Sequence, residues 1–311
     1  MKDKSTKNLT KSRNIGSIEN NTRIPDKDGD VMTIATKDVI SIPPSKSIKE
    51  ATEVMMEHNF RRLPVTDAGS GKLLGIVTVM DILDFLGGGK KFNIIVNTYD
   101  DNFLQAINEP TREIMTRDVI TVTNKDSIDK AIDTMLDHYV GAVPILNAER
   151  KLVGIITERD ISLSFAGVLT EQTAEDVMSN NVISTTPGTP IEGACKIMVR
   201  NSFRRIPIIG GREYEGSEKK LLGIITTTNI VNYLNDKKLF TNMASNNATD
   251  VLNATVSDIM ADKVCTVEPT TRLGEICEIF KERNIGGLPV TKNDEIIGIV
   301  TERDILRAVK K

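Results

Sequence analysis

The sequence predicts an α/β protein built from four copies of a strand–helix–strand–strand–helix unit, arranged as two pairs. Three observations support this prediction: an apolar phrase that ends in Thr-x-x-Asp or Thr-x-x-Asn, a strand with a central proline, and the spacing of the copies. The phrase occurs at residues 74–81, 153–160, 222–229 and 297–304. The strand prolines are Pro64, Pro144, Pro207 and Pro289, and their intervals of 80, 63 and 82 residues indicate two pairs.

Each phrase predicts a buried strand followed directly by a helix. A glycine and a short β-branched run are typical of a buried strand, and the threonine that ends the run can cap the next helix. Thr78 and Asp81, like their counterparts, are therefore expected where free backbone N–H groups favour anions. The same spacing is also a capping-box variant that needs no ligand, and the two interpretations are compatible.

The first unit shows the predicted order of elements. A short strand at 38–42 precedes two prolines, and Ser45 or Ser47 caps a helix whose apolar residues recur at helical spacing. Residues 61–66 and 73–77 form a hairpin around a glycine-containing turn, and the last helix ends at three glycines. The other units match this order, with first strands near 118–122, 181–184 and 263–267.

The two pairs define the domain organisation. We expect a polar tail at 1–30 and repeats at 31–88, 112–166, 174–236 and 256–311. One unit of about 55 residues is small for an independent core, and two units that face each other remove this difficulty. The tail is rich in Lys, Asn, Ser and Thr, so we expect it to be disordered and solvated. Contact between its basic residues and a polyanion is the alternative.

The composition excludes several classes of protein. The 311 residues are 39% hydrophobic and 27% charged, which is typical of a globular protein. A net charge of −3 gives no overall attraction to nucleic acid or anionic lipid. No apolar run approaches the ~20 residues of a membrane span, and the amino end lacks an apolar signal core. We therefore expect a cytoplasmic protein that contacts neither membrane nor nucleic acid.

The cysteines and histidines show neither a disulfide framework nor a metal-binding pattern. Cys195, Cys265 and Cys277 lack C-x-x-C spacing, and we expect small buried residues in a reducing compartment. His58 and His138 occupy the same position in two repeats. A polar helix end is the favoured interpretation of that position, and a ligand role is the alternative.

This arrangement resembles the CBS domain, named after cystathionine β-synthase. The resemblance is carried by the strand before the first helix, the apolar-Pro-apolar strand and the Gly-h-h-Thr-x-x-Asp phrase, four times over 31–311. Two pairs imply two Bateman modules, a layout similar to that of the gamma subunit of AMP-activated protein kinase. The family usually binds AMP, ADP, ATP or S-adenosylmethionine in clefts between paired repeats. The resemblance thus implies a regulatory adenosine ligand and no cofactor.

The resemblance also implies roles for single residues. Asp81, Asp160 and Asp304 would hold the ribose diol, because a carboxylate can accept hydrogen bonds from two neighbouring hydroxyl groups. The threonines of the phrases would donate to ribose or phosphate oxygens: Thr78, Thr157, Thr226 and Thr301. The residues beside adenine would be Ile40, Ile120, Ile183 and Cys265. Each site would be shared across a pair: Asp81 with Ile120 and Val140, Asp160 with Ile40 and Phe60, Thr226 with Cys265 and Ile285, and Asp304 with Ile183 and Phe203.

Arginines are the expected phosphate ligands, because guanidinium groups bind phosphate bidentately. Four of them occupy positions where the family often has phosphate-binding His or Arg: Arg61, Arg62, Arg204 and Arg205. Arg159 and Arg303, inside Thr-Glu-Arg-Asp, are further candidates. A solvated strand edge is the alternative interpretation of the arginine pairs.

Some positions differ among the repeats. Gly141 and Gly286 replace the first arginine of the pair and would leave room for the ligand. In the third repeat Asn229 replaces the aspartate, so binding there is left open. A long turn at 210–220 in the same repeat would suit contacts with another molecule.

Three classes of function remain to be compared. The first is a non-catalytic sensor of adenine nucleotides that acts on an unknown effector protein, with homodimerisation left open. Sensing of S-adenosylmethionine or of a dinucleoside polyphosphate is a variant of this hypothesis. The second is a scaffold that binds a protein or RNA partner. The third is an enzyme, which the sequence disfavours because it contains no P-loop and no evident nucleophile–base pair.

Overall fold

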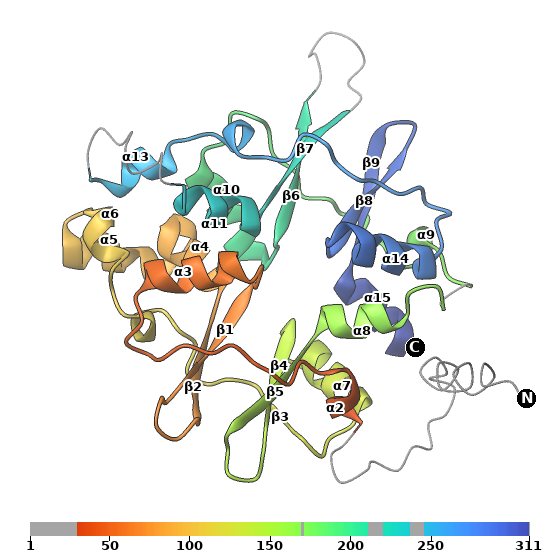
Figure 1. The fold of residues 1–311 in the computed structure, drawn as a ribbon. Coiled ribbons are helices and arrows are strands. Elements are labelled where there is room, and N and C mark those ends of the chain that lie inside the picture. Colours follow the sequence, from red (N-terminus) through yellow and green to blue (C-terminus); the bar gives the residue numbers. More distant parts are fainter. Residues whose placement is uncertain (1–29, 169–170, 211–219, 237–245, 311) are drawn as a thin grey trace, which may run out of the picture.

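The computed structural model describes residues 30–168, 171–210, 220–236 and 246–310. These residues form four α/β units grouped around a common centre (Figure 1). The predicted polar tail lies outside the described residues except for Asp30, and so do residues 211–219 of the predicted long turn.

Each unit contains a helix, an antiparallel hairpin and a second helix. Repeat 1 comprises α3 (Ile48–Glu57), β1 (Arg62–Thr66), β2 (Leu73–Thr78), α4 (Val79–Leu83) and the π-helical η1 (Asp84–Gly88). Repeat 2 comprises β3 (Val122–Thr123), α7 (Ile128–Asp137), β4 (Ala142–Leu146), β5 (Leu152–Thr157) and α8 (Glu158–Ser164). Repeat 3 comprises α10 (Ile191–Asn201), β6 (Arg205–Gly210), β7 (Lys220–Thr226) and α11 (Thr227–Leu234). Repeat 4 comprises α14 (Leu273–Arg283), β8 (Gly287–Lys292), β9 (Glu295–Thr301) and α15 (Glu302–Lys310).

Short helices occupy the segments between these units. They are α2 (Val31–Ile34), η2 (Lys90–Phe92), α5 (Asn93–Tyr99), α6 (Phe103–Ala106), η3 (Thr111–Glu113), α9 (Ala174–Val177), α13 (Ala248–Leu252) and η4 (Val256–Asp258).

The hairpins have the predicted composition. Pro64 of β1 pairs with Ile76 of β2, and the other three prolines occupy the same place in their hairpins. A register shift follows the residue after each proline, as between Val65 and Thr66. Because an irregularity of this kind strengthens the local twist, all four hairpins bend at the same point.

The predicted first strand is shorter than expected. Repeat 2 has a strand of two residues, β3 beside β4, of which only Val122 lies in the predicted range, and repeat 1 has a single bridge from Ile42 to Val65. Repeats 3 and 4 have equivalent single bridges. The residues that precede these bridges line cavities, so they do not extend the sheet.

Repeats 1 and 2 pair by exchanging the segments that precede them. Thr36, ahead of repeat 1, bridges to Ile155 of repeat 2, and Thr116, ahead of repeat 2, bridges to Ile76 of repeat 1. Repeats 3 and 4 make the same exchange through the bridges Ser179–Ile299 and Ile224–Ala261. The pairing predicted from the proline spacing is therefore confirmed.

The glycine of each phrase permits this exchange. A Cβ atom at Gly75 would lie 2.7 Å from the Sδ of Met115 and 2.9 Å from the Thr116 carbonyl oxygen. A Cβ atom at Gly223 would lie 2.7 Å from the Sδ of Met260. The other two glycines face Met32 and Met178. A larger residue at Gly75, Gly223 or Gly298 would crowd the exchanged segment, whereas at Gly154 the nearest atoms lie 3.3–3.5 Å away, so the glycine is a packing requirement at three of the four positions.

Helices join the two pairs into one body (Figure 1). Helix α4 and η1 of repeat 1 pack against α10 of repeat 3, while α8 of repeat 2 packs against α14 and α15 of repeat 4. The buried apolar residues accordingly form two cores, one shared by repeats 1 and 3 and the other by repeats 2 and 4. The strand bridges thus pair repeat 1 with repeat 2 and repeat 3 with repeat 4, whereas the helices pack repeat 1 against repeat 3 and repeat 2 against repeat 4. A polar centre lies between the four repeats.

Cys195 and Cys277 are fully buried in α10 and α14, in agreement with the prediction, and Cys265 is half-buried. Burial raises the pKa of the Cys277 thiol to about 12. Within the described part of the chain, no helix combines the length and the apolar character needed to cross a membrane.

Candidate functional site

The threonine and the aspartate or asparagine of each phrase form a helix cap. In repeat 2, the backbone N–H and the Oγ1 of Thr157 both donate to Oδ2 of Asp160, at 2.8 and 2.7 Å. The other three phrases make the same two bonds, and in repeat 3 the Oδ1 of Asn229 takes the place of the carboxylate oxygen. The capping box is therefore complete in repeats 1, 2 and 3, and in all four repeats one side-chain oxygen of the aspartate or asparagine is already engaged.

The second carboxylate oxygen has different surroundings in the three aspartates. Lys91 of η2 donates to Oδ1 of Asp81. Arg307 of α15 lies 3.3 Å from Oδ1 of Asp304. Among the described residues, no cation lies within ion-pair distance of Asp160. Burial raises the pKa of both Asp160 and Asp304 above the ordinary value.

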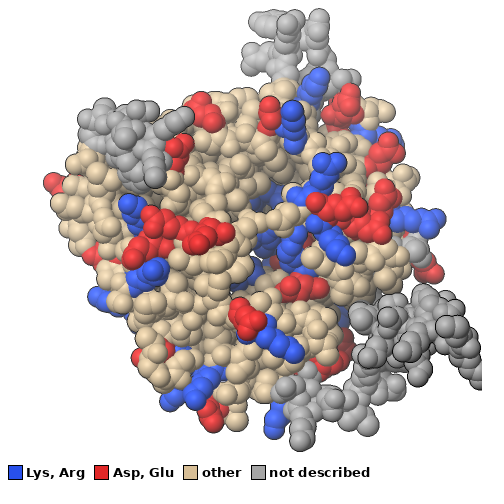
Figure 2. All heavy atoms as spheres, in the orientation of Figure 1, with Lys and Arg blue, Asp and Glu red and all other residues tan. Residues whose placement is uncertain are grey.

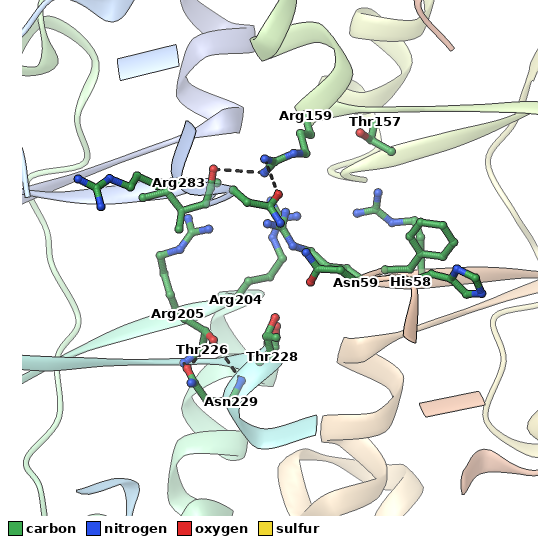
Figure 3. Close-up of a pocket in the computed structure, with 18 of the residues that line it drawn as sticks. His58, Asn59, Thr157, Arg159, Arg204, Arg205, Thr226, Thr228, Asn229 and Arg283 are labelled. Atoms are coloured by element: carbon green, nitrogen blue, oxygen red, sulfur yellow. Dashed lines mark hydrogen bonds between the residues drawn. The ribbon is translucent and has the colours of Figure 1, made fainter. Parts of the chain in front are cut away.

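The four caps line two cavities, each of which extends across both pairs of repeats. Cavity 1, of about 900 Å³, contains the caps of repeats 2 and 3 and is the pocket in Figure 3. Cavity 2, of about 820 Å³, contains the caps of repeats 1 and 4. Each cavity therefore combines one cap from each Bateman-like pair, which sequence reasoning did not predict.

All of the residues singled out from the sequence line one or both cavities. Cavity 1 receives Ile40, Phe60, Thr157, Arg159, Asp160, Thr226, Asn229, Cys265 and Ile285. Cavity 2 receives Thr78, Asp81, Ile120, Val140, Ile183, Phe203, Thr301, Arg303 and Asp304. Arg61, Arg62, Arg204 and Arg205 line both. The structure brings together each predicted combination across a pair, such as Asp160 with Ile40 and Phe60.

Six arginines gather where the two cavities meet, and basic side chains line the hollow in the middle of the face in Figure 2. Together with the two glutamates described below they form what we call the wall: Arg61, Arg62, Arg159, Arg204, Arg205 and Arg303. In Figure 3, Arg159 reaches this region from repeat 2, and Arg204 and Arg205 reach it together from repeat 3. Arg159 also donates to Oδ1 of Asn284 at 2.7 Å and to the carbonyl oxygen of Phe280 at 3.1 Å. It thereby fixes repeat 2 to the end of α14 in repeat 4.

Two buried glutamates were missed by sequence reasoning. Glu158 accepts from Arg204 at 2.7 Å and from Arg303 at 2.6 Å. Glu302 accepts from Arg61 at 3.0 Å and from Arg159 at 3.3 Å. Both side chains are 1% exposed. The available signal was that Thr-Glu-Arg-Asp occurs only in repeats 2 and 4, whereas Phe-Arg-Arg occurs only in repeats 1 and 3.

The arginines and glutamates perturb one another. Burial alone would raise the pKa of Glu158, but the guanidinium groups of Arg204 and Arg303 bring it below its ordinary value. Burial, with nearby arginines, lowers the pKa of Arg62 to about 10 and that of Arg205 to about 9. The described structure shows no hydrogen bond or ion pair from either of these two side chains. The wall therefore carries more positive than negative charge, an arrangement that can bind anions.

The glycines before the strand prolines leave room for protein groups rather than for open space. A Cβ atom at Gly141 would lie 2.9 Å from Oε2 of Glu158 and 3.3 Å from Nη2 of Arg62. At Gly286 it would overlap the carboxylate of Glu302, and at Gly287 the guanidinium of Arg205. The glycines therefore make room for the glutamates and arginines of the wall, and not for the ligand as the sequence suggested.

Some further residues line cavity 1, among them His58, for which a ligand role was the alternative interpretation. His58, at the end of α3, stacks on Phe60 with ring centroids 5.4 Å apart, and both rings line cavity 1. Thr228, Lys263 and Arg283 also line this cavity. No group of three or more His, Cys, Asp or Glu residues within the described ranges could hold a metal ion.

Comparison with protein families identifies the repeats. The model of the CBS domain matches residues 29–88, 112–167, 174–236 and 256–311. The chain belongs to the CBS domain family. Protein MJ1225 of Methanocaldococcus jannaschii is 41% identical over 280 residues, which are 89% of this chain and 98% of that protein.

The CBS arrangement of the whole chain also occurs in solved structures. The crystal structure of MJ1225, described as a proposed archaeal homologue of γ-AMPK, has a TM-score of 0.84 at 40% identity and covers 90% of this chain and 99% of that one. A Pyrococcus horikoshii protein has a TM-score of 0.58 at 23% identity, covers 90% of this chain and 99% of that one, and shows the fold alone. L-aspartate semialdehyde sulfurtransferase of M. jannaschii is 35% identical over 136 residues, 42% of this chain but only 23% of that enzyme.

Proposed function

We propose that the chain is a non-catalytic, cytoplasmic regulatory protein that binds adenosine nucleotides in its two cavities and signals their concentration to a partner protein. The observation that carries this proposal is the combination, in each cavity, of helix caps able to meet a ribose with a wall of arginines able to meet phosphate. The relation to MJ1225, described as a proposed γ-AMPK homologue, supports the same function.

Cavity 1 offers the most complete set of groups for a nucleotide. Asp160 retains an oxygen without an ion-pair partner among the described residues, which suits a ribose hydroxyl donor. Ile40 and Phe60 would provide an apolar surface for adenine, and Arg61 and Arg159, which line the same cavity, would provide guanidinium groups for the phosphates. The arginine excess favours AMP, ADP or ATP over S-adenosylmethionine, because the sulfonium group of the latter is a cation.

A dinucleoside polyphosphate is the second candidate ligand. One continuous cavity contains both the Asp160 cap and the Asn229 cap, with shared arginines between them. Such a ligand has a nucleoside at each end and phosphates in the middle, which matches this order of groups.

Thermal melts test the proposal. The full chain is heated alone and with AMP, ADP, ATP, S-adenosylmethionine, diadenosine tetraphosphate or GTP. A ligand at 100 times its Kd adds ~2.7 kcal/mol per site, which raises Tm by several degrees. We expect an adenosine phosphate to raise Tm, and Asp160→Ala to reduce that rise. If protein freed of bound nucleotide responds to none of them, the scaffold hypothesis replaces the sensor hypothesis.

A further inference from the structure

The two buried glutamates occupy a position that distinguishes the repeats. Glu158 and Glu302 are the first residues of α8 and α15, and Val79 and Thr227 occupy this position in repeats 1 and 3. The backbone N–H donates in the same way in all four, for example from Glu158 to the carbonyl of Gly141 and from Val79 to that of Arg61. The backbone is therefore equivalent, and only the side chains differ.

Each glutamate holds arginines that belong to the candidate phosphate sites. Glu302 binds Arg61, which lines both cavities, and Arg159, which lines cavity 1. Glu158 binds Arg204, which lines both cavities, and Arg303, which lines cavity 2. The carboxylates themselves line neither cavity and lie behind the arginines. A phosphate that enters a cavity must therefore share or withdraw guanidinium groups that a glutamate already binds.

The charges of the wall do not cancel. Six guanidinium groups face two carboxylates, and the two arginines without ion pairs, Arg62 and Arg205, have lowered pKa values because of burial and their arginine neighbours. An anion of several charges would therefore be attracted to the wall. The two carboxylates reduce this attraction without abolishing it.

We propose that Glu158 and Glu302 act as internal competitors of ligand phosphate and so set how much negative charge the two cavities accept. The inference rests on the proposed function, because it assigns the specificity of the same cavities. The glutamates are positioning residues: they contact the arginines and not the ligand. In this account the glutamates stabilise the arginines when no ligand is bound, and a bound phosphate replaces part of these ion pairs with its own.

Isothermal titration calorimetry of the full chain at neutral pH tests this inference with inorganic triphosphate, AMP and adenosine as probes. The Glu158→Gln/Glu302→Gln variant keeps the side-chain size and removes both charges. We expect it to bind triphosphate at least about tenfold more tightly than the unchanged protein, AMP several-fold more tightly, and adenosine with unchanged affinity. The two single variants are expected to have affinities between those of the double variant and the unchanged protein.

A matched control removes two glutamate charges from surface ion pairs. Glu149 pairs with Lys151 and Glu192 with Lys196 outside the wall, so Glu149→Gln/Glu192→Gln should leave triphosphate affinity unchanged. Equal or weaker triphosphate binding by the Glu158 and Glu302 variants would overturn the inference. AMP binding in that case would leave the proposed function intact. Tighter triphosphate binding without any adenosine or AMP binding would instead support the inference and contradict the proposed function.

Discussion

The two cavities contain the same kinds of residue and differ in the availability of their carboxylates. In cavity 2, Asp81 is paired with Lys91 and Asp304 with Arg307. In cavity 1, Asp160 has no cationic partner among the described residues, and Asn229 is uncharged. Four nearly identical phrases therefore give unequal sites, because the groups that neutralise the aspartates come from outside the phrase.

Lys91 illustrates how this difference arises. It lies in η2, beyond the glycines that end repeat 1, and its backbone N–H donates to Oδ1 of Asp84 at 2.9 Å. This bond fixes η2 against the preceding helical segment and directs the Lys91 side chain to Asp81. We expect an adenosine ligand to enter cavity 1 first, because in cavity 2 the ribose must compete with a cation of the chain.

The largest effect is expected from a change that affects both cavities alike. A Cβ atom at Gly287 would overlap the guanidinium of Arg205, so Gly287→Ala should push this flexible side chain out of the wall. A hydrogen bond to a charged group contributes about 1.5–3 kcal/mol, so AMP affinity should fall tenfold or more while Tm changes little. Calorimetry measures the affinity, and Gly188→Ala, where a Cβ atom meets nothing within 4 Å, is the control. Unchanged AMP affinity in Gly287→Ala would show that Arg205 does not bind the phosphate.

A smaller effect is expected on the thermal stability of the protein when the charge of Asp160 in cavity 1 is removed. Burial raises the pKa of Asp160, so its charge costs stability at pH 7 and this cost disappears as the pH falls below the ordinary value of 3.8. Asn229 makes the same two cap bonds as an amide. Asp160→Asn should therefore raise Tm at pH 7 by about 2–4 °C, the shift that ~1 kcal/mol produces, and the gain should vanish in acid.

Asp176 provides the control for that measurement. Its exposed side chain caps the short helix α9 through Thr173, and hydrogen bonds from Thr173 lower its pKa. Asp176→Asn should therefore not raise Tm at neutral pH. A similar gain in both variants would show that burial of Asp160 is not the cause.

The smallest effect is expected from removing the cation that pairs with the carboxylate of Asp81 in cavity 2. Lys91→Ala removes the cation paired with Asp81, and partly exposed ion pairs contribute about 0.2–1 kcal/mol. Adenosine binding to cavity 2 should become up to about fivefold tighter, detectable by calorimetry as a strengthened second binding event. Lys90→Ala, at the exposed neighbouring position, should leave binding as it was. If neither variant changes the second event, Lys91 does not cause the difference between the cavities.

The repeats and their pairing could be predicted because they depend on local patterns that occur four times. Gly75 and its counterparts, the strand prolines and the threonine caps each have a local physical reason. The arginines of the wall were predicted as phosphate ligands, but their glutamate partners could not be predicted, because Glu302 meets Arg61 across 241 residues and Glu158 meets Arg303 across 145. No pattern within a repeat indicates such a partner. The same reason explains why Asp81 and Asp160 look alike in sequence and differ in the structure.

The central claim is that Asp160 in cavity 1 holds the ribose of an adenosine nucleotide, and titration of AMP into the full chain tests it most directly. Asp160→Ala removes a charged hydrogen-bond acceptor, so AMP affinity should fall by tenfold or more. Asp81→Ala, at the matching position in cavity 2, should change the affinity of the first binding event less than threefold. A larger loss in Asp81→Ala than in Asp160→Ala, or no loss in either, would contradict the account.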